Sequence, residues 1–226
     1  MSDPRSLKDR IVVVTGAGQG IGRAYAHAVA GDGGTAVIAE INEERAAAVA
    51  AEAFALDVSS EESCRQFADA VGSRFGRVDG LVNNAAIFST ITMKPFSEIT
   101  VREWDTLMSV NLRGPWMLTT ALLPLLRAGH DASIVNIASD AVWLGRPGYL
   151  HYVASKGGVA GMTFALSHEL GADGIRINTV SPGPTYTEVD RETVSPEQHT
   201  AMLARQSLAR DAHPDDMVGP VVFLLS

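Results

Sequence analysis

The sequence predicts a single doubly wound α/β domain, in which helices cover both faces of a parallel sheet. Short apolar runs rich in Val and Ile alternate with longer amphipathic segments along nearly the whole chain. Runs that are apolar throughout are typical of strands buried on both faces of a parallel sheet. The chain has 226 residues and no linker interrupts the alternation, so we expect one domain.

Six strands and five helices are expected in alternating order. The strands are residues 11–15, 35–40, 54–58, 78–83, 133–139 and 175–181. The helices are residues 20–30, 43–52, 61–75, 101–127 and 152–170. Two helix starts are marked by capping-box spacing, Ser59 with Glu62 and Thr100 with Glu103.

Composition and charge argue against several classes of protein. Lys and Arg number 18 against 26 Asp and Glu, which gives a net charge of −8. A surface that binds nucleic acid or an anionic membrane needs clustered Lys and Arg, so the acidic net charge argues against both kinds of surface. No apolar stretch approaches the length of a membrane span. The lone Cys64 has no partner for a disulfide and no CxxC motif, so we expect a cytoplasmic protein without a metal site.

A glycine-rich turn, residues 16–22, joins the first strand to the first helix and is called the glycine loop below. Its Gly16, Gly20 and Gly22 follow the pattern TGxxxGxG. Glycine permits positive φ and a close approach of backbone to a pyrophosphate, and the helix N-terminus offers free N–H groups. The position after the first strand favours a dinucleotide site over a plain turn between strand and helix.

Glu40 ends the second strand, 18 residues beyond Gly22. In this fold class an acidic residue there accepts hydrogen bonds from the adenosine ribose hydroxyls and repels a 2′-phosphate. Neither Ile41 nor Asn42 is basic, and Gln19 in the loop is uncharged. NAD is therefore favoured over NADP, and the alternative is a solvated acid at a strand end.

Tyr152 and Lys156 are four residues apart on an expected helix, which places both on one face. A phenol has a pKa of about 10, too high for a base at neutral pH, and a neighbouring ammonium favours the phenolate. Tyr152 could then exchange a proton with an alcohol or carbonyl oxygen. The pair alone is a frequent coincidence, and a surface Lys beside a partly buried Tyr is the alternative.

Two further polar residues are candidates for the same site. Ser139 ends the fifth strand, and open α/β sheets bind ligands beyond the carboxyl ends of their strands. No GxSxG motif surrounds it, so a hydrogen bond to the reacting oxygen is favoured over a nucleophile. Asn111 precedes Pro115 by four residues, and proline lacks the N–H that would bond the Asn111 carbonyl. We expect a kink there that leaves this carbonyl free for a water molecule; a kink beside a buried Asn is the alternative.

As a set, these residues resemble the short-chain dehydrogenase/reductase family. The resemblance implies a Rossmann-type sheet and hydride transfer between a nicotinamide and an alcohol/carbonyl pair. One position departs from the family pattern, because Ala86 stands where glycine is usual. The matching motifs run in family order over residues 11–183: Thr15-Gly16-x3-Gly20-Ile21-Gly22, Asp57-Val58, Asn83-Asn84-Ala85-Ala86, Asn111, Ser139, Tyr152-x3-Lys156 and Pro182-Gly183.

The resemblance also implies roles for single residues. Tyr152 is the general acid/base, and Lys156 lowers its pKa and holds the nicotinamide ribose. Ser139 positions the substrate oxygen, and Asn111 holds a water in a proton relay to Lys156. With the glycine loop and Glu40 included, the residues expected to contact the cofactor are Gly16, Gln19, Gly20, Ile21, Glu40, Ile41, Asp57, Val58, Asn84, Ala85, Tyr152, Lys156, Pro182, Gly183, Thr185 and Thr187.

The substrate side is less marked in the sequence. The polar segment at about residues 184–214 is expected to form a substrate lid. Trp143, Leu144, Tyr149, His151 and residues 87–94 are expected to line a pocket for a hydrophobic or aromatic ketone or secondary alcohol. Since family members usually continue through another strand, the resemblance implies that a C-terminal strand is missing from these 226 residues.

The favoured function is that of an NAD-dependent short-chain alcohol dehydrogenase or ketone reductase. Its alternatives are a non-catalytic dinucleotide-binding protein on the same fold and an NADP-dependent enzyme resembling 3-oxoacyl reductases. An extended-branch sugar-nucleotide epimerase is disfavoured by the chain length. The expected helices 101–127 and 152–170 are apolar on more than one face, so a homotetramer or homodimer is expected.

Overall fold

Six parallel strands form one sheet in the computed structural model, which describes residues 6–50, 52–189 and 196–226. Their order is β3-β2-β1-β4-β5-β6, and each neighbouring pair is parallel. This confirms the expected doubly wound, Rossmann-type fold. The strands are β1 (Ile11–Thr15), β2 (Thr35–Glu40), β3 (Ala53–Ala55), β4 (Gly80–Asn83), β5 (Ser133–Ile137) and β6 (Arg176–Val180).

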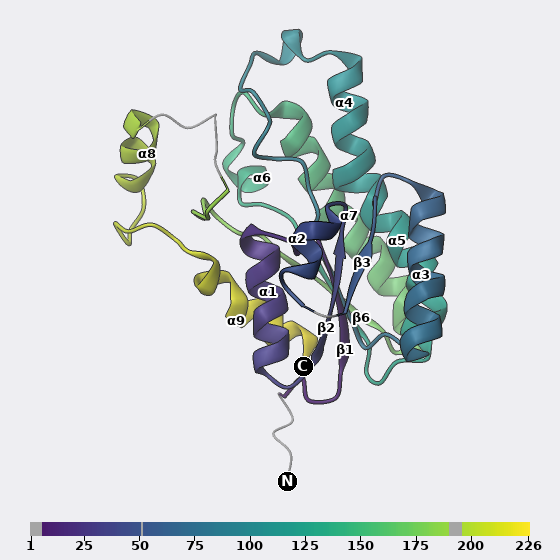
Figure 1. Ribbon diagram of the computed structural model, residues 1–226. Helices are drawn as coiled ribbons and strands as arrows, with labels where there is room; N and C mark the ends of the chain where they lie inside the picture. Colours follow the sequence, from purple (N-terminus) through teal and green to yellow (C-terminus); the bar gives the residue numbers. More distant parts are fainter. Residues whose placement is uncertain (1–5, 51, 190–195) are drawn as a thin grey trace.

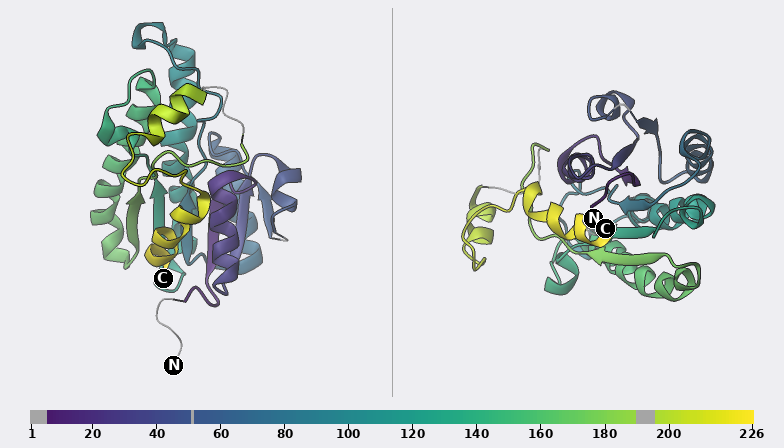
Figure 2. Two further views of the ribbon diagram at one scale, coloured as in Figure 1. Left: turned by 90° about the vertical axis from the view of Figure 1, so that its left-hand side faces the viewer. Right: turned by 90° about the horizontal axis from the view of Figure 1, so that it is seen from below.

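Helices cover both faces of the sheet, which Figure 2 shows from below. Two short helices, α6 and α8, lie at the end of the molecule to which the strands point (Figure 1). The α-helices are α1 (Gly20–Gly31), α2 (Glu43–Ala47), α3 (Glu61–Phe75), α4 (Val101–Met108), α5 (Gly114–Arg127), α6 (Ala141–Leu144), α7 (Leu150–Leu170), α8 (Pro196–Leu203) and α9 (Pro214–Leu225). Two 3₁₀ turns, η1 (Phe96–Glu98) and η3 (Gly171–Asp173), and a π turn, η2 (Ser109–Arg113), complete the described elements.

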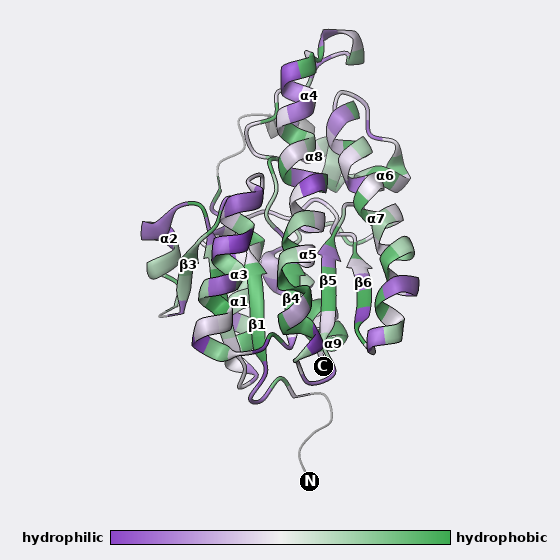
Figure 3. Cartoon of the chain, turned by 90° about the vertical axis from the view of Figure 1, so that its right-hand side faces the viewer, coloured by the Kyte–Doolittle hydropathy of each residue, from purple (hydrophilic) through white to green (hydrophobic). Residues whose placement is uncertain are grey.

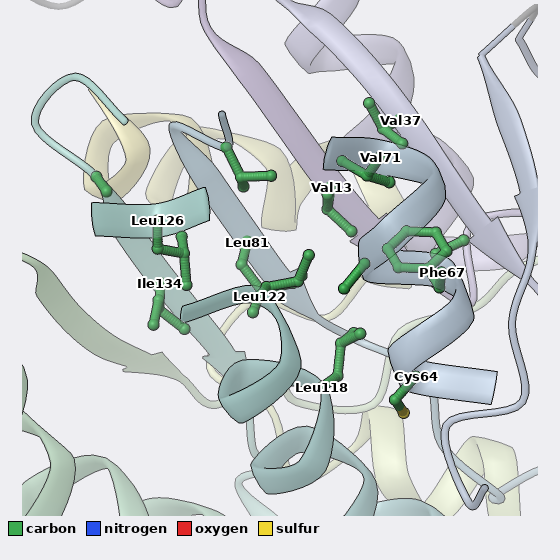
Figure 4. Packing of buried hydrophobic residues seen from close by; sticks show 14 of the residues in the cluster. Val13, Val37, Cys64, Phe67, Val71, Leu81, Leu118, Leu122, Leu126 and Ile134 are labelled. Atoms are coloured by element: carbon green, nitrogen blue, oxygen red, sulfur yellow. The ribbon is translucent and has the colours of Figure 1, made fainter. Parts of the chain in front are cut away.

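Two apolar clusters hold the helices against the sheet. Val12 and Val14 of β1 belong to the cluster that includes buried residues of α1 and α9. Val13, between them, belongs to the cluster on the opposite face, where Phe67 of α3 and Leu122 of α5 pack (Figure 4). Strand β1 is hydrophobic along most of its length, as Figure 3 shows. Burial of alternate side chains on opposite faces explains why these strands read as continuous apolar runs.

Several predicted boundaries were wrong. The third strand ends at Ala55 rather than at residue 58, and α2 ends at Ala47 rather than at residue 52. The cap of α3 is Ser60, whose side chain accepts from the Ser63 N–H, and not Ser59. The Ser59 side chain instead donates to Asp57, within the turn that precedes the helix. The helices α6, α8 and α9 were not predicted.

The long helix expected at residues 101–127 is interrupted. Thr100 and Glu103 form the predicted capping box at its start. The π turn η2 then separates α4 from α5, and Asn111 lies within it, just before Pro115. Insertions of this kind are frequent at functional sites because they turn a side chain or carbonyl out of the regular helical pattern. The irregularity predicted at Asn111 is therefore present.

Candidate active site

A cleft of about 570 Å³ lies beyond the carboxyl ends of the strands, with walls formed by the segments that follow all six strands of the sheet. Every residue expected to contact a cofactor lines this cleft, and so does Ser139. Asn111 is not part of the lining. The structure thus brings together residues that are up to 171 positions apart, from Gly16 to Thr187.

The start of the glycine loop is fixed to the end of β4 by Thr15 and Asn84. The Thr15 hydroxyl accepts hydrogen bonds from the backbone N–H groups of Asn84 and Ala85, both at 2.9 Å. The Asn84 side chain donates to the carbonyls of Thr15 at 2.9 Å and Gly16 at 3.3 Å. Asn84 therefore holds the loop in shape, whether or not it also contacts a ligand.

Two glycines of the loop have no room for a side chain. Gly16 has φ +62°, and a Cβ there would lie 2.8 Å from the Ala85 Cα. A Cβ on Gly22 would lie 2.3 Å from the Gly16 carbonyl oxygen and 2.5 Å from the Asn84 side-chain nitrogen. Both distances are far below van der Waals contact, so the tight turn requires glycine. The close contacts are with the chain itself, so these two glycines fix the shape of the loop.

Glu40 is buried at the end of β2 and its carboxylate is held by backbone N–H groups. One oxygen accepts from Gly18 at 3.1 Å, and the other accepts from Ile41 at 3.0 Å and Asn42 at 3.3 Å. These bonds fix the carboxylate beside the loop, at the end of the cleft lined by Glu40 and Asp57, which is called the adenosine end after the group expected there. Arg45 of α2 also lines this end, and sequence reasoning missed it because only the residues directly after Glu40 were considered.

Asp57 and Val58 line the same end, beyond β3. The Asp57 carboxylate accepts from the Ser59 N–H at 2.9 Å and from the Ser59 hydroxyl at 2.7 Å. A carboxylate used in this way stabilises the turn into α3 and leaves its remaining lone pairs toward the cleft. The shortened β3 is the reason that both residues lie on a turn rather than within a strand.

The N-terminus of α1 already receives an anionic group from the chain itself. The Gly20 N–H donates to Glu188 at 2.9 Å, and Arg23 forms an ion pair with the same carboxylate oxygen at 2.9 Å. The Gly20 N–H is the main cause of a lowered pKa for Glu188. Free N–H groups at the start of a helix favour anions, and this contact shows that the glycine loop can hold one.

Tyr152 and Lys156 lie on the first turns of α7, both buried. The Lys156 Nζ is 6.0 Å from the centre of the Tyr152 ring and donates to the Ile137 carbonyl at 2.7 Å. Burial lowers the pKa of Lys156 to about 8. The ammonium is therefore still largely protonated at neutral pH, close to the phenol whose ionised form it favours.

Ser139 lies two residues beyond β5, where the chain continues beside the segment after β6. The Ala138 N–H donates to the Val180 carbonyl at 2.8 Å, and the Asp140 N–H donates to the Pro182 carbonyl at 3.0 Å. The Ser139 hydroxyl accepts from the Ala141 N–H at 3.2 Å. These backbone contacts place Ser139 on the cleft wall together with Pro182.

Asn111 lies behind the cleft and acts through its side chain. Its oxygen accepts from the Ile87 N–H at 2.8 Å, and its nitrogen donates to the Ile87 carbonyl at 3.1 Å and to Ser155 at 3.4 Å. The side chain thus joins η2 to the segment after β4 and to α7. Sequence reasoning considered only the Asn111 carbonyl and missed this contact.

The end of the cleft next to Tyr152 is called the substrate end, after the group expected there. Its lining differs from the sequence prediction. Trp143 and Leu144 are both 71% exposed and do not line it, because α6 turns them to solvent. His151 is buried outside the lining as well. Tyr149 does line the cleft, as expected, and so does Phe88, whose ring centre is 4.8 Å from that of Tyr152.

Two charged residues also line the substrate end, and neither was predicted. Arg146 places its guanidinium 5.1 Å from the Tyr149 ring centre. Asp140 is half-buried, and burial raises the pKa of its carboxyl group. Among the described residues there is no group of three or more His, Cys, Asp or Glu that could hold a metal ion. None of the described helices is long and apolar enough to cross a membrane.

Comparison with known proteins decides the family. A family model described as Enoyl-(Acyl carrier protein) reductase matches residues 16–226. The chain belongs to the short-chain dehydrogenase/reductase family. The D-threitol dehydrogenase of Mycolicibacterium smegmatis is a family member 34% identical over 229 aligned positions, which cover 97% of this chain and 87% of that protein.

Solved structures of short-chain dehydrogenases/reductases superpose over nearly the whole chain. The 3-ketoacyl-(acyl-carrier-protein) reductase of Brucella melitensis, complexed with NADH, is 30% identical, with a TM-score of 0.86 over 98% of this chain and 92% of that chain. A candidate NAD(P)-dependent gluconate 5-dehydrogenase of Beutenbergia cavernae, with NADP at low occupancy, is 34% identical, with a TM-score of 0.85 over 98% and 91%. As a short-chain dehydrogenase/reductase, the protein is an oxidoreductase of alcohols and ketones.

Proposed function

We propose that the protein transfers a hydride between NAD(H) and a secondary alcohol or its ketone, with Tyr152 as general acid/base. The observation that carries this proposal is one cleft that joins the glycine loop to Tyr152, Lys156 and Ser139. A non-catalytic nucleotide-binding protein on this fold would need only the first of these parts. The buried Lys156 beside Tyr152 is costly to maintain and favours a chemical role.

The residues at the adenosine end fit an NAD(P) cofactor. Gly16 and Gly22 allow the tight turn of the loop, and the Gly20 N–H already binds a carboxylate. Glu40 lies where it can accept hydrogen bonds from ribose hydroxyls. Bound there, the nicotinamide coenzyme supplies or accepts the hydride. The residues proposed to hold it are the sixteen named above on the cleft wall.

The catalytic residues then handle a single proton. In alcohol oxidation the Tyr152 phenolate accepts the hydroxyl proton, and in ketone reduction the Tyr152 phenol returns it to the carbonyl oxygen. The Lys156 ammonium stabilises the phenolate, and the Ser139 hydroxyl holds the reacting oxygen beside Tyr152. Asn111 keeps the segment after β4 in place against α7, and its carbonyl is proposed to hold the relay water.

The substrate end favours a ketone or alcohol with both an apolar and a polar part. Phe88 and Tyr149 offer ring faces next to Tyr152. Asp140 and Arg146 offer a hydrogen-bond acceptor and a donor on the same wall. The expectation of a hydrophobic or aromatic ketone or secondary alcohol depended in part on Trp143, which is exposed. We therefore propose a small hydroxylated ketone, or the corresponding diol, as the substrate class.

The function is tested by mixing the protein with NAD⁺ and a panel of secondary alcohols and diols, and by following NADH formation. Ketones with NADH test the reverse direction. We expect turnover of at least one pair, with diols favoured over simple alcohols. Binding of NADH without turnover of any alcohol or ketone would instead support the non-catalytic alternative, and no binding at all would contradict the proposal.

The preference for NAD over NADP is a separate part of the proposal. Glu40 favours NAD because its carboxylate repels a 2′-phosphate, whereas Arg45 at the same end would attract one. We expect Glu40→Ala to lower the NAD/NADP ratio of kcat/KM about tenfold, which corresponds to about 1.4 kcal/mol. The matched control is Glu43→Ala, which removes an equal charge from the exposed start of α2. An unchanged ratio in Glu40→Ala contradicts the assignment.

The assembly and location of the protein also remain proposals. Trp116 of α5 is 52% exposed and Phe164 of α7 is 72% exposed, on the two helices expected to be apolar on more than one face. Such large exposed side chains favour a homotetramer or homodimer. The buried free thiol of Cys64 is compatible with the cytoplasm. The lid expected at residues 184–214 lies partly outside the described residues and stays a prediction.

A further inference from the structure

The segment that follows β6 lies directly on the glycine loop. Val189 and Thr187 are the residues that a Cβ on Gly20 would meet, at 3.5 Å and 3.8 Å. The Thr187 hydroxyl accepts from the Val189 N–H at 3.2 Å, which stiffens the turn between them. The other end of this segment is anchored at Ala212, whose carbonyl accepts from the Tyr186 N–H at 2.8 Å. Residues 185–189 are therefore held over the loop at both ends.

Among the described residues, Glu188 is the only one whose side chain accepts a hydrogen bond from the Gly20 N–H, at 2.9 Å. Its carboxylate also pairs with Arg23, one turn into α1, at 2.9 Å. The Gly20 amide lowers the pKa of Glu188, so this carboxylate is ionised at neutral pH. A backbone N–H at a helix start and a neighbouring cation are together what a phosphate group needs.

We propose that Glu188 is an internal ligand of the glycine loop, which holds residues 185–189 over the loop until the diphosphate of a nucleotide displaces it. This inference rests on the proposed nucleotide site. Two anions cannot share the Gly20 N–H, since each would need the same donor and would repel the other. The contact is half exposed to solvent, with Glu188 at 47% and Arg23 at 43% exposed, so it can open without unfolding the core.

Displacement has two consequences for nucleotide binding. The observed affinity for a diphosphate is reduced by the fraction of molecules in which Glu188 occupies the loop. Entry of the nucleotide also frees residues 185–189 from the loop, and this couples cofactor binding to the position of the segment that follows β6. A ligand without phosphates does not compete with Glu188 and leaves the segment where it is.

The test measures binding of ADP-ribose, NADH and adenosine by calorimetry to the wild type, Glu188→Ala and Glu188→Asp. Aspartate keeps the charge but is shorter by one methylene, so it cannot reach Gly20 and Arg23 from the same backbone. We expect both variants to bind ADP-ribose and NADH about threefold to tenfold more tightly than the wild type, on the scale of one exposed charge-assisted contact. Adenosine affinity should be the same in all three proteins.

Several results would overturn the inference. If Glu188→Asp binds like the wild type and only Glu188→Ala is tighter, general charge repulsion explains the effect and the contact does not. Equal tightening for adenosine, or no tightening in either variant, also contradicts it. If neither variant binds more tightly but the wild type binds NADH normally, the proposed nucleotide site stands and the inference alone fails. If no protein of the series binds NADH, both fail.

Hydrogen exchange of the nucleotide-free protein provides a readout that does not depend on any ligand. The Gly20 amide should be protected in the wild type and should exchange faster in both variants, because its acceptor is lost. Amides in the centre of β1 serve as the internal reference. Equal protection of Gly20 in all three proteins would show that Glu188 does not hold this amide in solution.

Discussion

The two ends of the cleft are stabilised by different kinds of contact. One is the adenosine end, and the other, which contains the proposed catalytic residues Tyr152 and Lys156, is called the catalytic end. At the adenosine end, carboxylates accept from nearby backbone N–H groups, as Glu40 does from Ile41 and Asp57 does from Ser59. At the catalytic end, the contacts join distant elements. Lys156 donates to the Ile137 carbonyl, and the Asn111 side chain accepts from the Ile87 N–H. The first end depends on local turns and on hydrogen bonds that join the glycine loop to β2 and to the segment after β4, whereas the second depends on how α5 and α7 pack against the sheet. Substitutions at the two ends should therefore have separable effects.

The largest effect is expected from Gly22→Ala, at the adenosine end. The added Cβ would lie 2.3 Å from the Gly16 carbonyl oxygen, so the loop must deform. We expect the free energy of unfolding to fall by about 3–4 kcal/mol and NADH affinity to fall with it. Urea unfolding and NADH titration measure the two effects.

Gly31→Ala is the matched control for this variant, on the same helix. A Cβ on Gly31 meets nothing within 4 Å, and alanine is the better helix former. The control should be as stable as the wild type, or more stable by up to about 1 kcal/mol. Normal NADH affinity in Gly22→Ala would show that the loop does not need its tight turn.

The next largest effect is expected from Asn111→Leu, at the catalytic end. Leucine fills a similar volume but leaves the Ile87 N–H and carbonyl without their side-chain partners, at a cost of about 2–3 kcal/mol. We expect kcat to fall while the Kd for NADH changes little, because the loop is untouched. Ser109→Ala in the same π turn is the control and should cost under about 1 kcal/mol. A parallel loss of NADH affinity would contradict the separation of the two ends.

Some features of the cleft can be predicted from the sequence and others cannot, for a physical reason. The glycine loop and Glu40 are recognisable because a short segment contains both the turn and its ligand groups. The contact between Glu188 and Gly20 joins residues 168 positions apart, and no local pattern indicates it. Tyr152 and Lys156 could be predicted because one helix carries both.

Errors at the substrate end have a similar origin. Trp143 is apolar, but apolarity does not tell whether a residue near a cleft points into it or to solvent. The short α6 ends at Leu144, and Gly145 then takes φ +58°, which turns the chain at the rim of the cleft. Phe88 belongs to the segment 87–94 that was expected to line the pocket, whereas Asp140 and Arg146 come to the cleft only through tertiary packing. The pattern of the sequence therefore predicts the fold and cofactor candidates that line the cleft, and it predicts the lining of the substrate end only in part.

A smaller effect is expected in the pH dependence of stability, through Lys156. Its pKa is lowered from 10.5 to about 8 in the folded protein because the ammonium is desolvated. Between these values the unfolded chain binds a proton that the folded chain does not, so raising the pH stabilises the fold. From pH 8 to about pH 9.5, the wild type should gain on the order of 1–2 kcal/mol relative to Lys156→Met. A difference that stays constant over this range would contradict the burial of a charged Lys156.

The most direct measurement compares NADH binding and alcohol oxidation in Tyr152→Phe. The control is Tyr25→Phe, which removes the hydroxyl of a buried tyrosine on α1 that has no hydrogen-bond partner in the described part of the chain. We expect Tyr152→Phe to bind NADH within about twofold of the wild type and to lose about 10²–10⁴-fold in kcat, while Tyr25→Phe keeps both. Turnover by Tyr152→Phe within about tenfold of the wild type would contradict the role of Tyr152 as general acid/base.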